Sequence, residues 1–322
     1  MRRRCRVCAS PLSQAPPRIA APRFQGRRRH EFATGAVYDG QWLGSERDGW
    51  GSMAWPDGSR YDGEWRRDKA TGRGRFEHSQ GDVYCGEWSE GLVHGSGALR
   101  HSDGTVYLGQ FASDLQHGYG EEVWSDESRF AGEFSWGRKS GGGVYRWPDG
   151  SEYAGQWREN EIQGSGSYSG KDRRAFDGQW SAGKLHGCGR YEWADGRCFS
   201  GQYAEDRKSG FGVFSWRDGR RYEGFWRAGS HHGVGRLCSP PQGSLLAEWD
   251  HGSILKLLGH SGAHLGDHGQ VVKQLGHSDS PLVPSGPAAP SGSARTGQSN
   301  TKNSHLATIL MDGVQSVTMP AY

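Results

Sequence analysis

Aromatic residues and glycines recur along the chain with a period of 23 residues and without insertions. Each unit starts with an aromatic residue, has glycine at position 3 and has a second aromatic residue at position 5. Nine units follow one another, and they start at Tyr38, Tyr61, Tyr84, Tyr107, Phe130, Tyr153, Phe176, Phe199 and Tyr222. Glycine also occupies positions 12 and 14 of every unit, so three columns in nine units hold 27 of the 53 glycines. A fixed period of this length indicates a repeat architecture.

The spacing within a unit predicts two β-strands that share one aromatic face. Side chains alternate along a strand with period two, so positions 1, 3 and 5 lie on one face of a first strand. Positions 12, 14, 16 and 18 lie on one face of a second strand. Position 16 is apolar in every unit except for Glu122, and position 18 is Trp in five units. The glycines beside these rings leave room for the rings to lie over the backbone.

Turn residues separate the predicted strands at regular positions. Position 8 is Gly, Asn or Asp in eight units, which suits a backbone with positive φ, and an Asp-Gly pair such as Asp57-Gly58 recurs between units. We therefore predict an all-β fold, an elongated repeat ribbon of about nine antiparallel β-hairpins that is roughly 85 Å long at a strand spacing of about 4.8 Å. Residues 31–37 match the second half of a unit and residues 245–249 match the first half, which predicts half-unit caps.

Charge and composition divide the 322 residues into three parts. Residues 1–30 contain nine Arg and no acidic residue, so we predict a basic, disordered head. Residues 31–252 hold 26 Lys or Arg and 33 Asp or Glu, a net charge of −7, and form the repeat array. Residues 253–322 are rich in Gly, Ser, His and Pro without a period, and we predict a disordered tail. No apolar run reaches the roughly 18 residues of a membrane-spanning helix, and nucleic acid is not an expected partner of an acidic array.

The pattern Tyr-x-Gly-x-Trp, a turn, His-Gly-x-Gly, an aromatic pair and Asp-Gly resembles the membrane occupation and recognition nexus (MORN) repeat, best seen in residues 84–106 and 176–198. Unit six departs from this pattern, because it reads Asp172-Arg173 where the family has Asp-Gly. The histidine before position 12 is kept in four units, at His94, His117, His186 and His232.

The resemblance implies a non-catalytic scaffold or adaptor that mediates protein–protein interaction or assembly near a membrane or a cytoskeletal or ciliary structure. Two alternatives stay open: a phospholipid-binding module for membrane recruitment, or a regulatory part related to MORN-containing phosphoinositide kinases without the kinase domain. The implied location is cytoplasmic, with peripheral attachment to a membrane, the cytoskeleton or a cilium as the open question.

The aromatic face is the predicted docking surface for protein partners, because aromatic rings give a large contact area for little loss of entropy. Mutual packing of the rings is the competing interpretation, and we expect stability to be their main role and docking to be a secondary role of the units at the ends of the array. Self-association is also left open. The predicted docking residues are Tyr38, Trp42, Trp55, Tyr61, Trp65, Tyr153, Trp157 and Trp226.

The head carries a candidate lipid anchor at Cys5 and Cys8, since stable membrane attachment takes two signals such as an acyl chain and a basic patch. Its nine Arg would draw the head to anionic lipids, whereas the acidic array would be repelled. The same Arg-rich, acid-free segment fits an organelle targeting peptide, although its prolines disfavour the amphipathic helix of such a peptide.

No arrangement of residues predicts catalysis, a cofactor or a metal. The glycines at positions 12 and 14 lack the Lys-Ser or Lys-Thr of a phosphate-binding loop and occur in all nine units, so we interpret them as packing positions. The repeat histidines lie on different units, and glycines interrupt the helix that would align His260, His264 and His268. We therefore predict that the chain is not an enzyme and that it has no cofactor.

Overall fold

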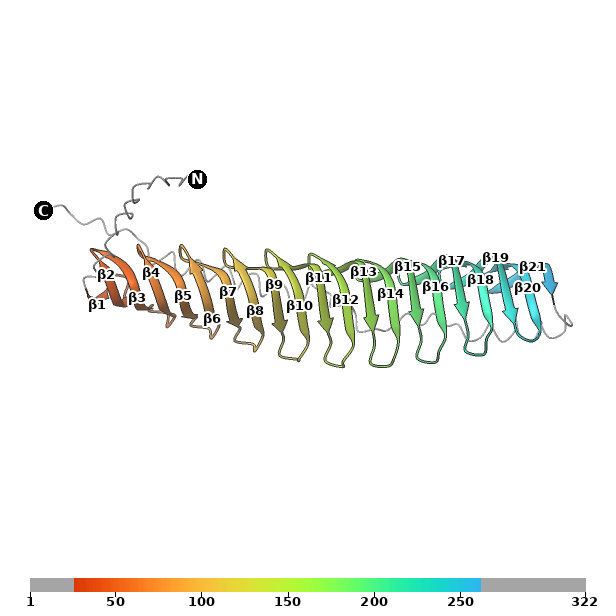
Figure 1. Cartoon of the computed structure of the whole chain (residues 1–322), viewed down its shortest axis with the longest axis horizontal. Coiled ribbons are helices and arrows are strands. Elements are labelled where there is room, and N and C mark those ends of the chain that lie inside the picture. Colours follow the sequence, from red (N-terminus) through yellow and green to blue (C-terminus); the bar gives the residue numbers. More distant parts are fainter. Residues whose placement is uncertain (1–25, 262–322) are drawn as a thin grey trace, which may run out of the picture.

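The computed structural model describes residues 26–261, and within them one antiparallel sheet of 21 strands is formed without any helix. Each strand pairs with the next one along the chain, so the sheet is a long ribbon whose strands cross its long axis (Figure 1). The predicted all-β repeat ribbon is confirmed.

The strands are β1 (Arg27–Glu31), β2 (Val37–Leu43), β3 (Glu46–Ala54), β4 (Arg60–Arg66), β5 (Lys69–Glu77), β6 (Val83–Ser89), β7 (Leu92–Arg100), β8 (Val106–Ala112), β9 (Leu115–Val123), β10 (Arg129–Ser135), β11 (Arg138–Arg146), β12 (Glu152–Arg158), β13 (Glu161–Ser169), β14 (Ala175–Ser181), β15 (Lys184–Glu192), β16 (Cys198–Ala204), β17 (Arg207–Ser215), β18 (Arg221–Arg227), β19 (Ser230–Ser239), β20 (Gly243–Asp250) and β21 (Ser253–Ser261).

The hairpin tips adopt the positive φ that the turn residues predict. Arg67 and Asp68, at positions 7 and 8 of unit two, have φ angles of 49° and 65°, as in a type I′ turn that matches the twist of the flanking strands. The Asp68 N–H donates a hydrogen bond of 3.0 Å to the carbonyl oxygen of Arg47 in the preceding unit. The equivalent backbone bond recurs from unit to unit, so each hairpin tip is fastened to the one before it.

A bulge in each repeat explains the glycine at position 12. Trp42 pairs with Arg47 while Gly40 pairs with Gly51, so β3 holds two more residues than β2 between these pairs. Gly49 lies in this bulge with a φ of 99°, which favours glycine. The side chain at position 4 closes the bulge, as the Gln41 Oε1 accepts a 2.7 Å hydrogen bond from the Trp50 N–H. Because two residues are inserted, the period-two alternation of faces is preserved across the bulge.

Strands extend beyond both predicted boundaries of the array. The head was expected to be disordered through residue 30, but β1 pairs with β2 and the Arg28 carbonyl accepts a hydrogen bond from Trp42 Nε1 at 3.1 Å. At the other end, residues 245–249 are not a half-unit cap, because β20 and β21 form a complete tenth hairpin. The remaining predictions for the head and the tail concern residues 1–25 and 262–322, which lie outside the described residues.

Candidate interaction surface

The rings at positions 1 and 5 form a continuous ladder on the concave face of the sheet, called the inner face below. Each position 1 ring meets the position 5 rings of its own and of the next unit edge to face. The Tyr38 ring centroid is 5.2 Å from that of Trp42 and 5.4 Å from that of Trp65. Equivalent contacts join every later unit to its neighbour, up to Tyr222 and Trp249. Edge-to-face pairs add stabilisation beyond the area that they bury.

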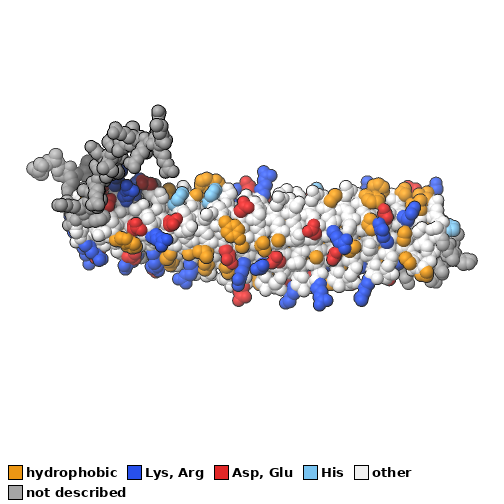
Figure 2. Space-filling model, viewed as in Figure 1, with side chains coloured by type: hydrophobic (Ala, Val, Ile, Leu, Met, Phe, Trp, Pro, Cys, Tyr) orange, Lys and Arg blue, Asp and Glu red, His pale blue; other side chains and the backbone are white. Residues whose placement is uncertain are grey.

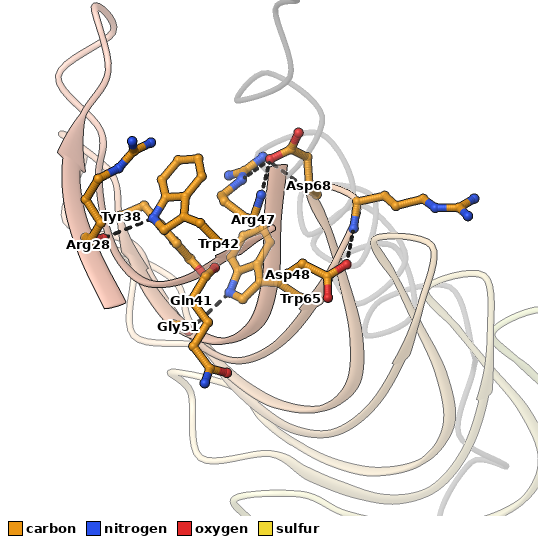
Figure 3. A network of polar contacts seen from close by, with 10 residues as sticks. Arg28, Tyr38, Gln41, Trp42, Arg47, Asp48, Gly51, Trp65 and Asp68 are labelled. Carbon is orange, nitrogen blue, oxygen red and sulfur yellow. Dashed lines mark hydrogen bonds and ion pairs between the residues drawn. The ribbon is translucent and has the colours of Figure 1, made fainter. Parts of the chain in front are cut away.

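Hydrogen bonds within the sheet hold the ladder rings in place (Figure 3). The Tyr38 hydroxyl donates to the carbonyl oxygen of Gln41 at 3.0 Å, and Trp65 Nε1 donates to that of Gly51 in the preceding unit at 3.1 Å. Burial raises the pKa of Tyr38 to about 12. A side chain at Gly40 or Gly51 would overlap the Tyr38 ring, which lies across both backbones. The ring of Tyr38 therefore makes its polar and its packing contacts within the sheet, whereas the Tyr203 hydroxyl in unit eight is buried without a hydrogen-bond partner.

Seven of the eight predicted docking residues belong to this ladder, and none of these seven is more than 5% exposed. The prediction of a docking surface is corrected for them, because the curved sheet packs the rings of consecutive units against one another. Their burial agrees with a main role in stability. The seven are Tyr38, Trp42, Tyr61, Trp65, Tyr153, Trp157 and Trp226.

The eighth residue, Trp55, belongs to a different set of rings that is half-buried. We call this set the tryptophan row, and it consists of the position 18 residues Trp55, Trp124, Trp147, Trp193 and Trp216. These rings pack against the edge of the buried core. The ring centroid of Trp147, for example, is 4.8 Å from that of Tyr145 and 5.8 Å from that of Tyr168. The sequence analysis noted Trp at position 18, but periodicity alone could not tell a half-buried ring from a buried one.

Position 10 supplies a further inner column that the sequence analysis missed, because its residues share no chemical character. Most of its side chains are buried even where they are polar. The column consists of Arg47, Ala70, Val93, Gln116, Lys139, Ile162, Leu185, Lys208 and His231.

Cations in this column are held by aromatic rings and by carboxylates. The Arg47 guanidinium lies 4.5 Å from the Trp65 ring centroid and 2.9 Å from Asp68 Oδ1 (Figure 3). Lys139 Nζ lies 3.2 Å from Glu122 Oε2 and 4.6 Å from the Trp124 ring centroid. Cation–π attraction strengthens where water is excluded. The ion pair also explains why Glu122 breaks the apolar pattern of position 16.

His231 closes the column in a neutral form. Burial, with a smaller contribution from the positive charge of Lys208, lowers its pKa to about 3. The imidazole stacks on the Tyr222 ring with centroids 3.8 Å apart. A neutral ring at this position avoids a further buried charge beside Lys208.

Acidic and basic side chains are interspersed with hydrophobic ones on the face of the molecule that Figure 2 presents. Many are paired, as Arg60 is with Asp62 at 2.7 Å. Exposed large hydrophobic residues gather mainly in units three to five and near the C-terminal end of the sheet. They include Val106, Leu108, Tyr119 and Trp136 in the first group and Phe211, Phe225, Val234, Leu255, Leu257 and Leu258 in the second.

Residues 26–261 contain no group of three or more His, Cys, Asp or Glu side chains that could hold a metal ion. Nor does any helix in this part of the chain have the length and hydrophobicity to cross a membrane. Cys5 and Cys8, the candidate lipid anchor, lie outside the described residues.

These features define an open, elongated repeat sheet with an aromatic inner face. A family profile described as the MORN repeat matches nine consecutive segments, and the chain belongs to this family. The segments are residues 38–60, 61–83, 84–106, 107–129, 130–152, 153–173, 176–196, 199–220 and 222–244. MORN repeats indicate a repeat-based interaction role and are generally non-catalytic binding modules.

Two solved structures are similar over most of their length. The TCP domain of Drosophila melanogaster SAS-4, in complex with a proline-rich motif of Ana2, has 10% sequence identity and a TM-score of 0.28, covering 67% of this chain and 94% of its own. The TCP10 domain of Danio rerio CPAP has 10% identity and a TM-score of 0.24, covering 73% and 99%. At these TM-scores neither neighbour bears on the function of this chain. No curated protein matches the chain.

Proposed function

We propose that the chain is a non-catalytic scaffold or adaptor in the cytoplasm, whose array mediates protein–protein interaction or assembly near a membrane or a cytoskeletal or ciliary structure. The observation that carries this proposal is the tryptophan row, because it offers half-buried rings along one margin of a single continuous sheet.

The tryptophan row is a better candidate for a protein interface than the buried ladder. Interface hot spots are enriched in Trp, and a ring already fixed by its neighbours loses little entropy when a partner covers it. Trp147, Trp193 and Trp216 are each held against a ring of the core. Each unit is two strands wide, about 9.6 Å, and the row has rings in units one, four, five, seven and eight, so it presents rings to an elongated partner at multiples of this spacing, with gaps at the other units.

A comparison of two variant pairs tests this proposal. Trp147→Ser with Trp193→Ser removes two rings of the row, and Leu108→Ser with Tyr119→Ser removes two exposed outer-face residues as the control. Proximity labelling in cells should show the same enriched proteins for wild type and control and their loss for the tryptophan variant. Equal labelling by all three proteins would contradict docking through the row. Circular dichroism and melting curves establish that both variants are folded.

Binding to anionic phospholipids is the second candidate, and the exposed arginines of β1 favour it. Arg27, Arg28 and Arg29 lie at the end of the sheet where the basic head enters. Each basic residue near an anionic membrane contributes on the order of 1 kcal/mol, whereas the acidic array is repelled. We expect deletion of residues 1–25, which removes six of the nine arginines and leaves β1 intact, to weaken salt-sensitive flotation with acidic liposomes, and replacement of Arg27, Arg28 and Arg29 by Ser in the same protein to remove most of the rest. Flotation that survives both changes would transfer lipid binding to the array itself and favour a membrane-recruitment module over the scaffold.

A further inference from the structure

Unit nine differs from the eight preceding units at position 4, on the outer face of the sheet, opposite the ladder. In units one to eight, position 4 is Gln or Glu, and its side-chain oxygen accepts a hydrogen bond from the N–H of position 13, which closes the bulge. In unit eight, Gln202 Oε1 accepts this bond from the Phe211 N–H at 2.9 Å. Unit nine keeps the bulge but has Phe225 at position 4, and a phenylalanine side chain has no acceptor for the Val234 N–H. Unit nine therefore gives up a contact that all earlier units make.

Phe225 instead forms an exposed apolar patch with residues of the two neighbouring strands. The Phe225 ring on β18 meets the Phe211 ring on β17 edge to face, with centroids 5.7 Å apart. Val234 follows on β19, and the three side chains are between 46% and 49% exposed. We call these three residues the outer patch. An exposed ring in place of an internal hydrogen bond departs from the local pattern at a cost in stability, which is typical of a binding surface.

The chain itself contains an apolar segment that is able to reach the outer patch. Residues 306–311 read Leu-Ala-Thr-Ile-Leu-Met, which is the most apolar run of six residues after Ser261 and carries no charge. Ser261 ends β21, and β19 lies two strands from β21, so the outer patch is on the order of 10–20 Å from this edge of the sheet. The 44 residues from 262 to 305 span at most roughly 145 Å, so the connection is long enough.

We propose that residues 306–311 bind the outer patch of the same chain. Their aliphatic side chains cover the Phe211 and Phe225 rings and remove this apolar surface from water. A segment tethered to the sheet meets the patch at a higher effective concentration than a segment of another molecule in dilute solution, which favours this occupant. The contact goes beyond the proposed function, because the tryptophan row lies on the inner face and stays open to partners.

Photo-crosslinking of the purified full chain tests the proposal. A photoreactive phenylalanine analogue replaces Phe211, so that an aromatic ring remains in the patch. The expected product has the mass of one chain, and its crosslinked peptide contains residues 306–311. A product with the mass of two chains would assign the patch to a second copy and overturn the inference. The inference is also overturned if no crosslink forms, if the crosslink joins another part of the chain, or if the same protein in cells is crosslinked to a different protein instead.

Phe225→Gln separates docking from folding, because it restores the residue type that closes the bulge in other units. We expect this variant to melt no lower than the wild type, while the amides of residues 306–311 exchange with solvent on the order of tenfold faster. Tyr119→Ser, which removes an exposed ring from the outer face of unit four, is the matched control and should leave this exchange unchanged. Equal exchange of residues 306–311 in the wild type and in Phe225→Gln would overturn the inference.

A change in the segment gives the reciprocal test. Ile309→Asp with Leu310→Asp places two charges in residues 306–311 and should abolish the crosslink from position 211, whereas a crosslink that persists would overturn the inference. Neither the patch variant nor the segment variant alters the tryptophan row. Failure of this inference therefore leaves the scaffold function to be decided by the variants of the row.

Discussion

At the scale of single residues, a glycine and an aromatic ring act as one packing unit. A side chain at Gly155 would overlap the Tyr153 ring and would lie 2.7 Å from the carbonyl oxygen of Ser165. We expect Gly155→Val to lower the free energy of unfolding by about 3 kcal/mol or more, because a ring and a backbone must both move. Asp177 is exposed, so Asp177→Val should change it by about 1 kcal/mol or less. Thermal melts followed by circular dichroism make the comparison, and equal melting temperatures would show that the face assignment is wrong.

Asp114 links stability to pH. It is 6% exposed, and burial raises its pKa to about 6, although its bond to the Val93 N–H favours ionisation. An acid with a raised pKa in the fold stabilises it fully below the usual value of 3.8, and this contribution is lost as the pH rises through 6. Asp114→Asn keeps the acceptor without the charge, as Asn160 does in unit six.

We therefore expect Asp114→Asn to be more stable than the wild type at pH 7 by on the order of 1 kcal/mol, and to lose this advantage at pH 4. Urea denaturation at both pH values measures the difference. Asp206→Asn is the matched control, because Asp206 accepts the same bond from Leu185 at 2.8 Å but is less buried. A gain that does not vary with pH would contradict the assignment to the Asp114 charge.

The sequence could predict the roles of residues at positions where every unit requires the same residue type. Positive φ at the turns requires particular residues, and this prediction is confirmed. Space beneath the rings is confirmed for the glycines at positions 3 and 14, but the prediction was wrong for position 12, where a side chain would meet the position 4 side chain, as at Gly72 and Glu64, and where the positive φ of the bulge requires glycine. Position 10 has no such requirement. Val93 and Lys139 both occupy it, because the side chains that surround position 10 differ between units three and five. The structure shows that position 10 is a buried inner position, because it shows the rings and carboxylates that surround each side chain there.

At the scale of strands, the pair of Glu122 on β9 and Lys139 on β11 couples units four and five. Removing one partner leaves a buried charge unpaired, so we expect Glu122→Leu alone to cost about 3 kcal/mol or more. Glu122→Leu with Lys139→Val places the residues that unit three has at these positions, Leu99 and Val93, and should recover most of that loss. A double-mutant cycle measured by urea denaturation gives the coupling. Additive losses would show that the two side chains do not depend on each other.

The elements at the ends of the array were the least predictable from the sequence. The tenth hairpin lacks the position 1 ring and has Lys256 and Leu258 where the other units have glycine, so it does not match the period. The two strands of this hairpin still pair, because the backbone N–H and C=O groups along β20 are available to β21. A period-two pattern also does not predict how deeply a ring on a given face is buried. The pattern assigns a ring to a face, but Trp42 is buried between its neighbours on that face while Trp55 is half-buried.

At the scale of the whole molecule, each strand pairs with its sequence neighbours, and the aromatic ladder joins one unit to the next. Stability in such an array is a sum of local terms and nearest-neighbour terms. We expect native-state hydrogen exchange to show the greatest protection in the middle units and a gradual decrease toward β1 and β21. Uniform protection along residues 26–261 would indicate all-or-none unfolding and would contradict this expectation.

Site-specific photo-crosslinking from rings of the tryptophan row shows whether partners dock there. A photoreactive phenylalanine analogue replaces Trp147 in one protein, Trp193 in a second and the outer-face Tyr119 in a third, each in the full chain in cells. If partners dock on the row, positions 147 and 193 give shared protein adducts, with little or no adduct from position 119. Adducts that form as well from position 119, or only from there, would contradict it.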